Sequence, residues 1–332
     1  MQIETPYLIF IGDAKDALAA KTGQGIVDWR PTWSLGQFRF ANCRADLNIP
    51  DMTVAEAVTA GAKTFVIGTV SPGGTLPESW IPVIISALAG GLDLASGMHT
   101  RLSTFPTVVA AAKKHGKKLF DVRHCDVHFS TGAGTARTGN RLLTVGTDCS
   151  IGKKYAALAI EQEMRKRGMN ADFRATGQTG ILIAGGGVAI DAVAADFIAG
   201  ACEYLSPENS IDHWDIVEGQ GSLFHPSFAG VSLGLLHGTQ PDAFVVCHEP
   251  TRTTMRNVDT PIASVDDVIE QTIALGRLTN PAIRCVGIAV NTAEFDDTQA
   301  NAYIGDMQGR FELPVTDPMR HGVVSIVNLL TD

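Results

Sequence analysis

Short apolar runs alternate along the chain with longer stretches in which apolar residues recur at helical spacing. A run that is apolar throughout predicts a strand buried on both faces, and a periodic stretch predicts a helix that buries one side. Strands that alternate with helices are typical of parallel sheets with crossover helices. The predicted strands cover residues 7–11, 64–68, 92–95, 118–122, 142–145, 171–175, 214–217, 243–248, 283–290 and 314–317.

Glycines punctuate the predicted helices. Gly61, Gly116 and Gly168 each follow a periodic stretch, where glycine ends a helix readily because it adopts the left-handed conformation. Gly23 and Gly25 are predicted to end the first helix in the same way. The predicted helices cover residues 15–24, 53–60, 80–90, 105–115, 155–167, 188–200, 265–278, 296–309 and 321–330.

Three connecting segments are distinctive. Residues 71–75 are predicted to form a loop. Residues 29–33 (WRPTW) place two tryptophans beside Arg30, and they predict either a packed loop around Pro31 or the wall of a ligand pocket in which Arg30 binds a carboxylate. Residues 128–139 are rich in Gly, Ser and Thr, which predicts an interdomain linker.

The fold class predicted from these patterns is α/β, with two doubly wound parallel-sheet domains. We expect a Rossmann-like N-terminal domain over residues 1–130 and a P-loop NTPase-like C-terminal domain over residues 131–332. No G-x-G-x-x-G motif follows the first strand, so dinucleotide binding by the N-terminal domain is weakly supported.

Composition narrows the class of protein. The 332 residues are 45% hydrophobic and 18% charged, as in ordinary globular proteins, and the chain is long enough for two cores. The net charge of −9 argues against nucleic acid as a partner. The six cysteines form no C-x-x-C pair, which argues for reduced thiols and against a disulfide framework or zinc site.

The N-terminal segment MQIETPYLIFIGDAK has no basic region before its apolar run, so we interpret it as a first strand rather than a signal peptide. No apolar run reaches the ~18 residues that a membrane span needs. We therefore expect a cytoplasmic protein without membrane contact, and a homo-oligomer.

The strongest chemical signal is a glycine-rich segment between an apolar run and a periodic stretch. Backbone N–H groups of such a loop converge on phosphate oxygens, and the helix that follows directs its unpaired N–H groups at the same anion. We predict a phosphate site formed by Gly146, Thr147, Asp148, Cys149, Ser150, Ile151, Gly152, Lys153 and Lys154.

Lys154 sets this loop apart. Phosphate loops that hold a nucleoside triphosphate carry Ser or Thr directly after the lysine, and its hydroxyl binds Mg²⁺. Lys154 occupies that position here and supplies a positive charge but no metal ligand. The loop is therefore predicted to hold a phosphorylated molecule without a metal ion and without cleaving it.

Titratable residues follow two of the later strands. Glu218 ends the strand 214–217, with Ser222 and His225 just beyond, and Arg252 follows the strand 243–248. Because the carboxyl ends of parallel strands line the ligand crevice, Asp215 or Glu218 is a candidate metal ligand, base or orienting group. His225 is either structural or functional. Asp191 lies on the predicted helix 188–200.

Two resemblances rest on these motifs. Residues 146–153 and 217–221 (VEGQG) resemble motifs of dethiobiotin synthetase, an ATP-dependent enzyme with a magnesium-binding Thr at the position of Lys154. A fuller resemblance is to a two-domain family, Rossmann-like and then P-loop, that includes the bacterial D-glutamate N-acetyltransferases. The motifs that carry it are residues 68–74, 96–99, 121–123, 146–153, 176–180, 190–197, 218–222, 225–227 and 247–250.

The fuller resemblance implies that acetyl-CoA is the co-substrate and that the acetyl group goes to the amine of D-glutamate or a related amino acid. CoA has a diphosphate and a 3′-phosphate and is not cleaved at phosphorus, which agrees with a metal-free loop. The alternatives are an ATP-dependent ligase or kinase similar to dethiobiotin synthetase, and a non-catalytic nucleotide sensor.

Attack of the amine on the thioester needs a base and a donor for the oxyanion. The candidate bases are Glu218, Asp191 and His225, and the donor is either Ser222 or a backbone N–H of a glycine turn. Arg30, Arg174 and Arg252 are the candidates for binding the substrate's carboxylates. We expect the helix N-terminus to lower the pKa of Cys149, but an acyl-cysteine ranks below direct transfer because phosphate fills the loop.

Overall fold

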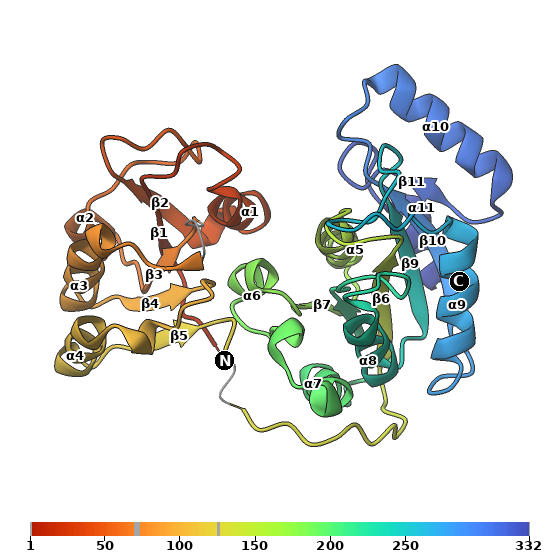
Figure 1. Cartoon of the computed structure of the whole chain (residues 1–332), viewed down its shortest axis with the longest axis horizontal. Coiled ribbons are helices and arrows are strands. Elements are labelled where there is room, and N and C mark those ends of the chain that lie inside the picture. The colour runs from red at the N-terminus through yellow and green to blue at the C-terminus, as the bar shows by residue number, and fades with distance from the viewer. Residues whose placement is uncertain (1, 70–73, 125–126, 332) are drawn as a thin grey trace. The chain divides into compact units, whose positions relative to one another are not determined.

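The computed structural model describes residues 2–69, 74–124 and 127–331. Most of the predicted loop 71–75, part of the motif 68–74, and Cys125 lie outside these residues. The chain forms two compact units: Met1–Val127 with Gly177–Ala189, and His128–Thr176 with Ile190–Asp332. Each unit is built on a parallel sheet (Figure 1), so the predicted α/β class with two parallel-sheet domains is confirmed.

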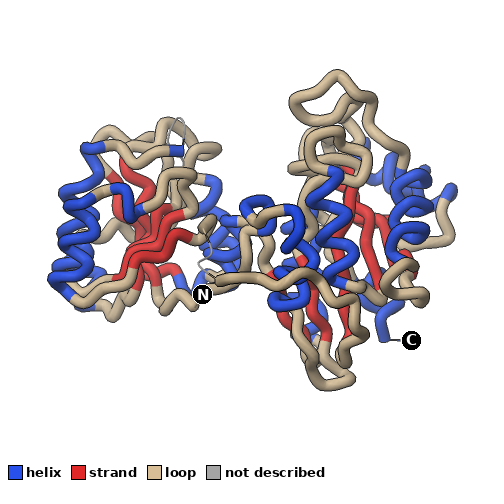
Figure 2. The backbone as a smooth tube through the Cα atoms, turned by 60° about the horizontal axis from the view of Figure 1, so that its bottom comes forward, coloured by secondary structure: helices blue, strands red, loops and turns tan. Residues whose placement is uncertain are grey.

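The sheet of the first unit has five parallel strands in the order β2-β1-β3-β4-β5. A core of residues from α2, α3 and α4 packs on one face of this sheet around Phe10 and Phe65, and Figure 2 shows helices flanking the strands. The elements are β1 Tyr7–Gly12, α1 Lys21–Trp29, β2 Ser34–Arg39, α2 Val54–Thr59, β3 Thr64–Ile67, α3 Ile81–Ala89, β4 Asp93–Ser96, α4 Pro106–His115 and β5 Leu119–Asp121.

Local sequence explains where two of these helices begin or end. Thr53 and Glu56 form a reciprocal capping box at the start of α2, which satisfies two backbone N–H groups. Pro106 opens α4, and Gly116 ends it in the left-handed conformation (φ 63°). Both helices lie close to their predicted bounds.

The predictions for residues 15–39 were wrong in two respects. Helix α1 begins at Lys21, close to where the predicted helix was to end, and Gly23 lies inside it. A Cβ on Gly23 would lie 3.0 Å from Ile9 Cγ2 and 3.2 Å from the Gly68 carbonyl oxygen, so this glycine permits close packing on the sheet. Strand β2 was not predicted, because its sequence SLGQFR is only partly apolar.

Residues Gly177–Ala189 belong to the first unit although the sequence on both sides of them belongs to the second. They contain α6 (Gln178–Ala184), which packs against α1. Thr179 Oγ1 lies 3.2 Å from Thr22 Oγ1, and Arg123 Nη1 donates a hydrogen bond to Gln178 Oε1 (2.7 Å). This excursion of the chain was not predicted from the sequence.

The sheet of the second unit has six parallel strands in the order β11-β10-β9-β6-β8-β7. Its predicted strands were all found. The elements are β6 Asn140–Gly146, α5 Lys153–Lys166, β7 Ala171–Arg174, α7 Ile198–Leu205, β8 Trp214–Val217, α8 Ala229–Thr239, β9 Ala243–His248, α9 Val265–Gly276, β10 Arg284–Val290, α10 Asp297–Arg310, β11 Val315–Thr316 and α11 Val324–Thr331.

Two helical predictions failed in this unit. The predicted helix 188–200 is broken into two single turns, Ile190–Ala192 and Ala195–Phe197, before α7 begins. The backbone is held by local bonds as it returns from the first unit, including Ile190 N–H to the Thr176 carbonyl (3.0 Å). Helix α8 was missed, because its sequence AGVSLGLLHGT has small and apolar residues on all sides instead of one stripe.

The segment before β6 has no regular secondary structure over residues 127–137. Arg137 holds the end of this segment against the rest of the second unit. Its Nη2 donates to the carbonyls of Gly238 (2.6 Å) and Thr239 (3.1 Å) at the end of α8, and its Nη1 donates to those of Glu203 and Ser206 at the end of α7. One guanidinium thus caps two helix ends, where carbonyls otherwise lack donors.

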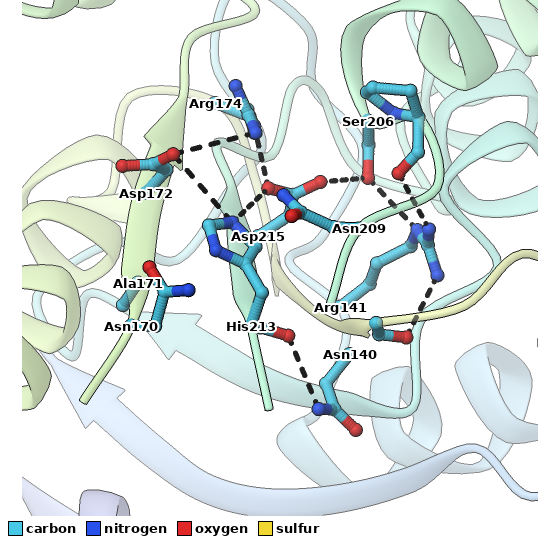
Figure 3. A network of polar contacts seen from close by, with 12 residues as sticks. Asn140, Arg141, Asn170, Ala171, Asp172, Arg174, Ser206, Asn209, His213 and Asp215 are labelled. Atoms are coloured by element: carbon cyan, nitrogen blue, oxygen red, sulfur yellow. Dashed lines mark hydrogen bonds and ion pairs between the residues drawn. The ribbon is translucent and has the colours of Figure 1, made fainter. Parts of the chain in front are cut away.

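A buried polar network lies near the amino ends of β6 and β8 (Figure 3). Asp215, with 1% of its surface exposed, accepts hydrogen bonds from Ser206 Oγ and from Arg174 Nε (2.7 Å), and it lies 3.0 Å from His213 Nε2. Arg141 Nε donates to the same Ser206 hydroxyl (3.0 Å). The network therefore compensates charges that the fold has removed from water.

Among the described residues, no helix combines the length and apolar character that crossing a membrane requires.

Candidate functional site

The glycine-rich loop joins β6 to α5, as predicted. Its backbone turns through positive φ at Ser150 (55°) and at Gly152 (109°), a conformation that glycine adopts readily. Strand β6 lies between β9 and β8, so the loop emerges at the carboxyl edge of the sheet between the ends of these strands. Gly152, the N-cap residue of α5, has no side chain with which to cap the first turn, and that turn contains no acidic residue.

Lys153 is the first residue of α5, and only 6% of its surface is exposed. Its Nζ donates a hydrogen bond to the backbone carbonyl of Asp148 (2.6 Å) and makes no ion pair with any described residue. Burial lowers the pKa of this ammonium. A buried cation at a helix N-terminus attracts an anion, because an anion would supply the missing countercharge.

Asp148 ties the loop to the segment after β9. Its Oδ2 accepts hydrogen bonds from Arg252 Nη1 (2.8 Å) and Arg256 N (2.8 Å), while Arg252 Nη1 also donates to the Cys149 carbonyl (2.6 Å). Burial by itself would raise the pKa of Asp148, but the hydrogen bonds from Arg252, Cys149 N and Arg256 N outweigh it, and the pKa is lowered. The carboxylate therefore stays ionised and holds the loop in place.

Cys149 is partly buried within the loop. Burial raises the pKa of its thiol, and the positive charges of Lys153, Arg256 and Arg252 offset this effect only in part. The expectation that the helix N-terminus lowers this pKa was wrong, because desolvation dominates. A protonated thiol is a weak nucleophile, which favours direct transfer over an acyl-cysteine.

Asp148, Cys149 and His225 place one potential ligand atom each within 4.8 Å of the others, a spacing that a metal ion could bridge. Both ring nitrogens of His225, however, already take part in hydrogen bonds. Its Nδ1 accepts a hydrogen bond from Ser227 N (3.1 Å), so Nε2 carries the proton that is donated to the Arg256 carbonyl (3.0 Å). In this arrangement neither ring nitrogen has a lone pair for a metal or for a substrate proton.

Glu218 lies at the carboxyl end of β8 and is buried. Its Oε2 accepts a hydrogen bond from Thr176 N (2.9 Å), which fixes the carboxylate beside the end of β7. The next residue passes close to Lys153, since a Cβ on Gly219 would lie 3.1 Å from Lys153 Cδ. The residue after Glu218 therefore packs against the side-chain stem of Lys153 at the edge of the sheet.

A cavity of about 20 Å³ lies beneath this edge, between β6, α8 and α9, and residues 219–223 form one wall. That volume is sufficient for about one water molecule. Thr272, which also lines the cavity, has a buried hydroxyl without a protein partner. The cavity is therefore suited to an ordered water and is too small for a substrate.

Ser222, a candidate oxyanion donor, lies on the wall of this cavity. Its hydroxyl accepts a hydrogen bond from Phe224 N (3.3 Å).

His248 lies at the end of β9, on the other side of the loop. Its Nδ1 is 3.0 Å from Thr147 Oγ1, and burial lowers the pKa of the imidazole to about 4. His248 is therefore neutral at neutral pH. His248 was not among the site residues predicted from the sequence.

Acidification is expected to destabilise the second unit through His248. Because the folded-state pKa lies below the unfolded one, the unfolded chain binds the proton first, and stability falls as the pH drops from about 6.5 towards 4. Between pH 7 and pH 5 this residue should cost about 2 kcal/mol. Urea unfolding of wild type and His248→Gln at both pH values measures the difference. A variant that loses as much stability as wild type would exclude His248 as the cause.

The structure brings some of the predicted site residues together and separates others. Cys149, Asp148, Arg252 and His225 form one cluster around the loop, and Glu218 and Ser222 lie beside it. Asp191 is exposed on the single turn Ile190–Ala192. The remaining two arginines lie elsewhere: Arg174 pairs with Asp215, and Arg30, in the first unit, lies over the ring of Trp33.

Family models, relatives and a solved structure match this chain. A family model described as "Domain of unknown function (DUF1611_C) P-loop domain" matches residues 128–327, and a second, "DUF1611_N Rossmann-like domain", matches residues 39–125. D-glutamate N-acetyltransferases from Tritonibacter scottomollicae and Pseudoalteromonas sp are 50% and 49% identical over 99% and 98% of this chain, covering 99% of each relative. The crystal structure of a DUF1611 family protein from Anabaena variabilis, at 29% identity, superimposes with a TM-score of 0.84 and covers 99% of this chain and 100% of that one.

The fold and the site define a two-domain α/β protein in which a Rossmann-like unit is followed by a P-loop unit. The chain belongs to the DUF1611 family. It is an enzyme of the acyltransferase class, an N-acetyltransferase.

Proposed function

We propose that this enzyme transfers the acetyl group of acetyl-CoA to the amine of D-glutamate, and that residues 146–153 hold the CoA phosphates without a metal ion. The observation that carries the proposal is Lys153, a buried ammonium at a helix N-terminus whose hydrogen bond goes to a backbone carbonyl. A phosphate would provide its countercharge. The two relatives named for D-glutamate supply the acceptor.

CoA fits the loop better than a nucleoside triphosphate does. Lys154 replaces the hydroxyl that ligates Mg²⁺ in triphosphate-binding loops, and its Nζ lies 4.9 Å from the ring centroid of Tyr155. Of the two Asp148 carboxylate oxygens, Oδ2 already accepts hydrogen bonds from Arg252 and Arg256 N. A diphosphate that is only anchored, and not cleaved, needs no such metal.

Glu218 is the proposed base. The ammonium of D-glutamate must lose one proton to the base before its nitrogen attacks the thioester carbon. The C–S bond then breaks, and the second proton that the nitrogen loses passes to the departing CoA thiolate, which gives the amide and CoA–SH. Neither nitrogen of His225 can take that proton in the tautomer that its two hydrogen bonds require, and Asp191 is exposed. Glu218 is buried at the carboxyl end of β8, the strand next to the one that leads into the loop, and the residue after it packs against Lys153.

Calorimetry with acetyl-CoA and with ATP, each with and without Mg²⁺, tests the proposal. We expect acetyl-CoA to bind equally well in either condition and ATP to gain nothing from Mg²⁺. Incubation with acetyl-CoA and D-glutamate should then release free CoA and N-acetyl-D-glutamate.

Mg²⁺-dependent ATP binding without acetyl-CoA binding would favour the ligase or kinase alternative. Acetyl-CoA binding without acetylation of D-glutamate would refute D-glutamate as the acceptor and favour a non-catalytic sensor. Glu218→Gln should bind acetyl-CoA normally and lose turnover; wild-type turnover in this variant would exclude Glu218 as the base.

A further inference from the structure

Three rings from separate elements meet beside the phosphate loop. They are His248 at the end of β9, Phe295 in the segment after β10, and Tyr303 on α10, and we refer to them as the ring cluster. The centroids of His248 and Tyr303 are 6.4 Å apart with the planes at 25°, and those of Phe295 and Tyr303 are 6.0 Å apart at 62°. All three residues are partly exposed, so the cluster is not sealed within the core.

The ring cluster borders the loop directly. His248 Nδ1 lies 3.0 Å from Thr147 Oγ1, and Asn291 lies beside Gly152, whose Cβ, if present, would be 3.7 Å from the Asn291 Cβ. In the sheet order, β9 and β10 lie on one side of β6, and β8 with Glu218 lies on the other. The loop therefore has an aromatic side and a carboxylate side.

The segment that carries Phe295 is held firmly. The buried Asp317 accepts hydrogen bonds from Thr292 N (3.0 Å) and Thr292 Oγ1, and Arg320 Nη2 donates to the Phe295 carbonyl (2.6 Å). These contacts fix the backbone at Thr292 and at Phe295, in the segment that follows Asn291 beside the loop. The backbone that carries the Phe295 ring is therefore held by the protein itself.

We propose that the ring cluster of His248, Phe295 and Tyr303 binds the adenine ring of the CoA donor, so that CoA crosses the loop with its thioester directed towards Glu218. This inference rests on the proposed function. The adenine of CoA is joined to the diphosphate through one ribose, so a ligand whose diphosphate is held by the loop must place its base close by. Flat uncharged bases stack on aromatic side chains. Glu218, on the carboxylate side, is the proposed base for the amine that attacks the thioester.

The test uses the full-length protein, with Tyr303→Ala, Phe295→Ala and Tyr303→Phe compared with wild type. By calorimetry, Tyr303→Ala should raise the Kd for CoA about tenfold. The KM for acetyl-4′-phosphopantetheine, which lacks adenosine, should stay unchanged in the same variant, and Tyr303→Phe should retain the ring and the affinity. Tyr204→Ala is the matched control, because Tyr204 is 54% exposed on α7 and contacts Phe129.

Wild-type affinity for CoA in both Tyr303→Ala and Phe295→Ala would overturn the adenine site while leaving the proposed function intact. Equal weakening for acetyl-CoA and acetyl-4′-phosphopantetheine would also overturn it, because the defect would then lie outside the adenosine. Failure of the wild-type protein itself to bind CoA would refute the proposed function, and the adenine site with it.

Discussion

Replacing Lys153 with methionine is expected to raise the Kd for CoA about 10- to 100-fold, the range that loss of one hydrogen bond to a charged group produces. The methionine keeps most of the aliphatic stem that packs near Gly219 but removes the charge. Calorimetry with CoA measures the change.

The same substitution should not reduce stability. Because burial lowers the pKa of Lys153 in the folded state, the unfolded chain binds the proton more readily, and the charged form costs stability at neutral pH. Removal of that charge should leave the urea midpoint unchanged or raise it. Loss of binding without loss of stability is the signature of a residue retained for its ligand.

Lys166 provides the matched control on the same helix, since its side chain is 78% exposed. Lys166→Met should alter neither CoA affinity nor stability. If Lys153→Met bound CoA as tightly as wild type, the loop would not be the anion site, and the assignment of CoA to it would fail.

The second large effect concerns Asp215. Its replacement by alanine is expected to lower the free energy of unfolding of the second unit by about 3–5 kcal/mol, the usual cost of leaving a buried charge uncompensated. Three groups would lose their common partner: the guanidinium of Arg174, the imidazole of His213 and the hydroxyl of Ser206. Hydrogen exchange of the β6, β7 and β8 amides at increasing urea concentration follows this unit separately from the first.

Asp266 is the control for this measurement. It pairs with Arg310 at 3.1 Å, but the two side chains are 61% and 63% exposed. Asp266→Ala should therefore change stability by no more than about 1 kcal/mol. Equal effects of the two substitutions would show that the network around Asp215 contributes no more than a surface ion pair.

The parts of this structure that depend on local sequence could be predicted. The loop from Gly146 to Lys153 has glycines and a lysine at fixed spacing between an apolar run and a periodic stretch, and the structure contains that strand, loop and helix. Strands such as β9 are apolar throughout because both faces are buried, so they were found as well.

The parts that depend on tertiary contacts could not be predicted. The sequence does not show that Asp148 meets His225 and Arg252, because distant segments bring them together. The pKa of Cys149 was predicted in the wrong direction because desolvation by neighbouring elements is not visible in the sequence. Arg174 was a reasonable candidate for a substrate carboxylate until Asp215 proved to be its partner.

The excursion of Gly177–Ala189 has a consequence for modularity. A gene segment encoding only the first 127 residues would lack α6 and its contacts with α1, and one encoding only the remainder would carry α6 without its partner. Neither half can be transplanted by a single cut. Because residues 177–189 of the first unit lie within the sequence of the second, only a gene segment that encodes both units keeps each of them whole.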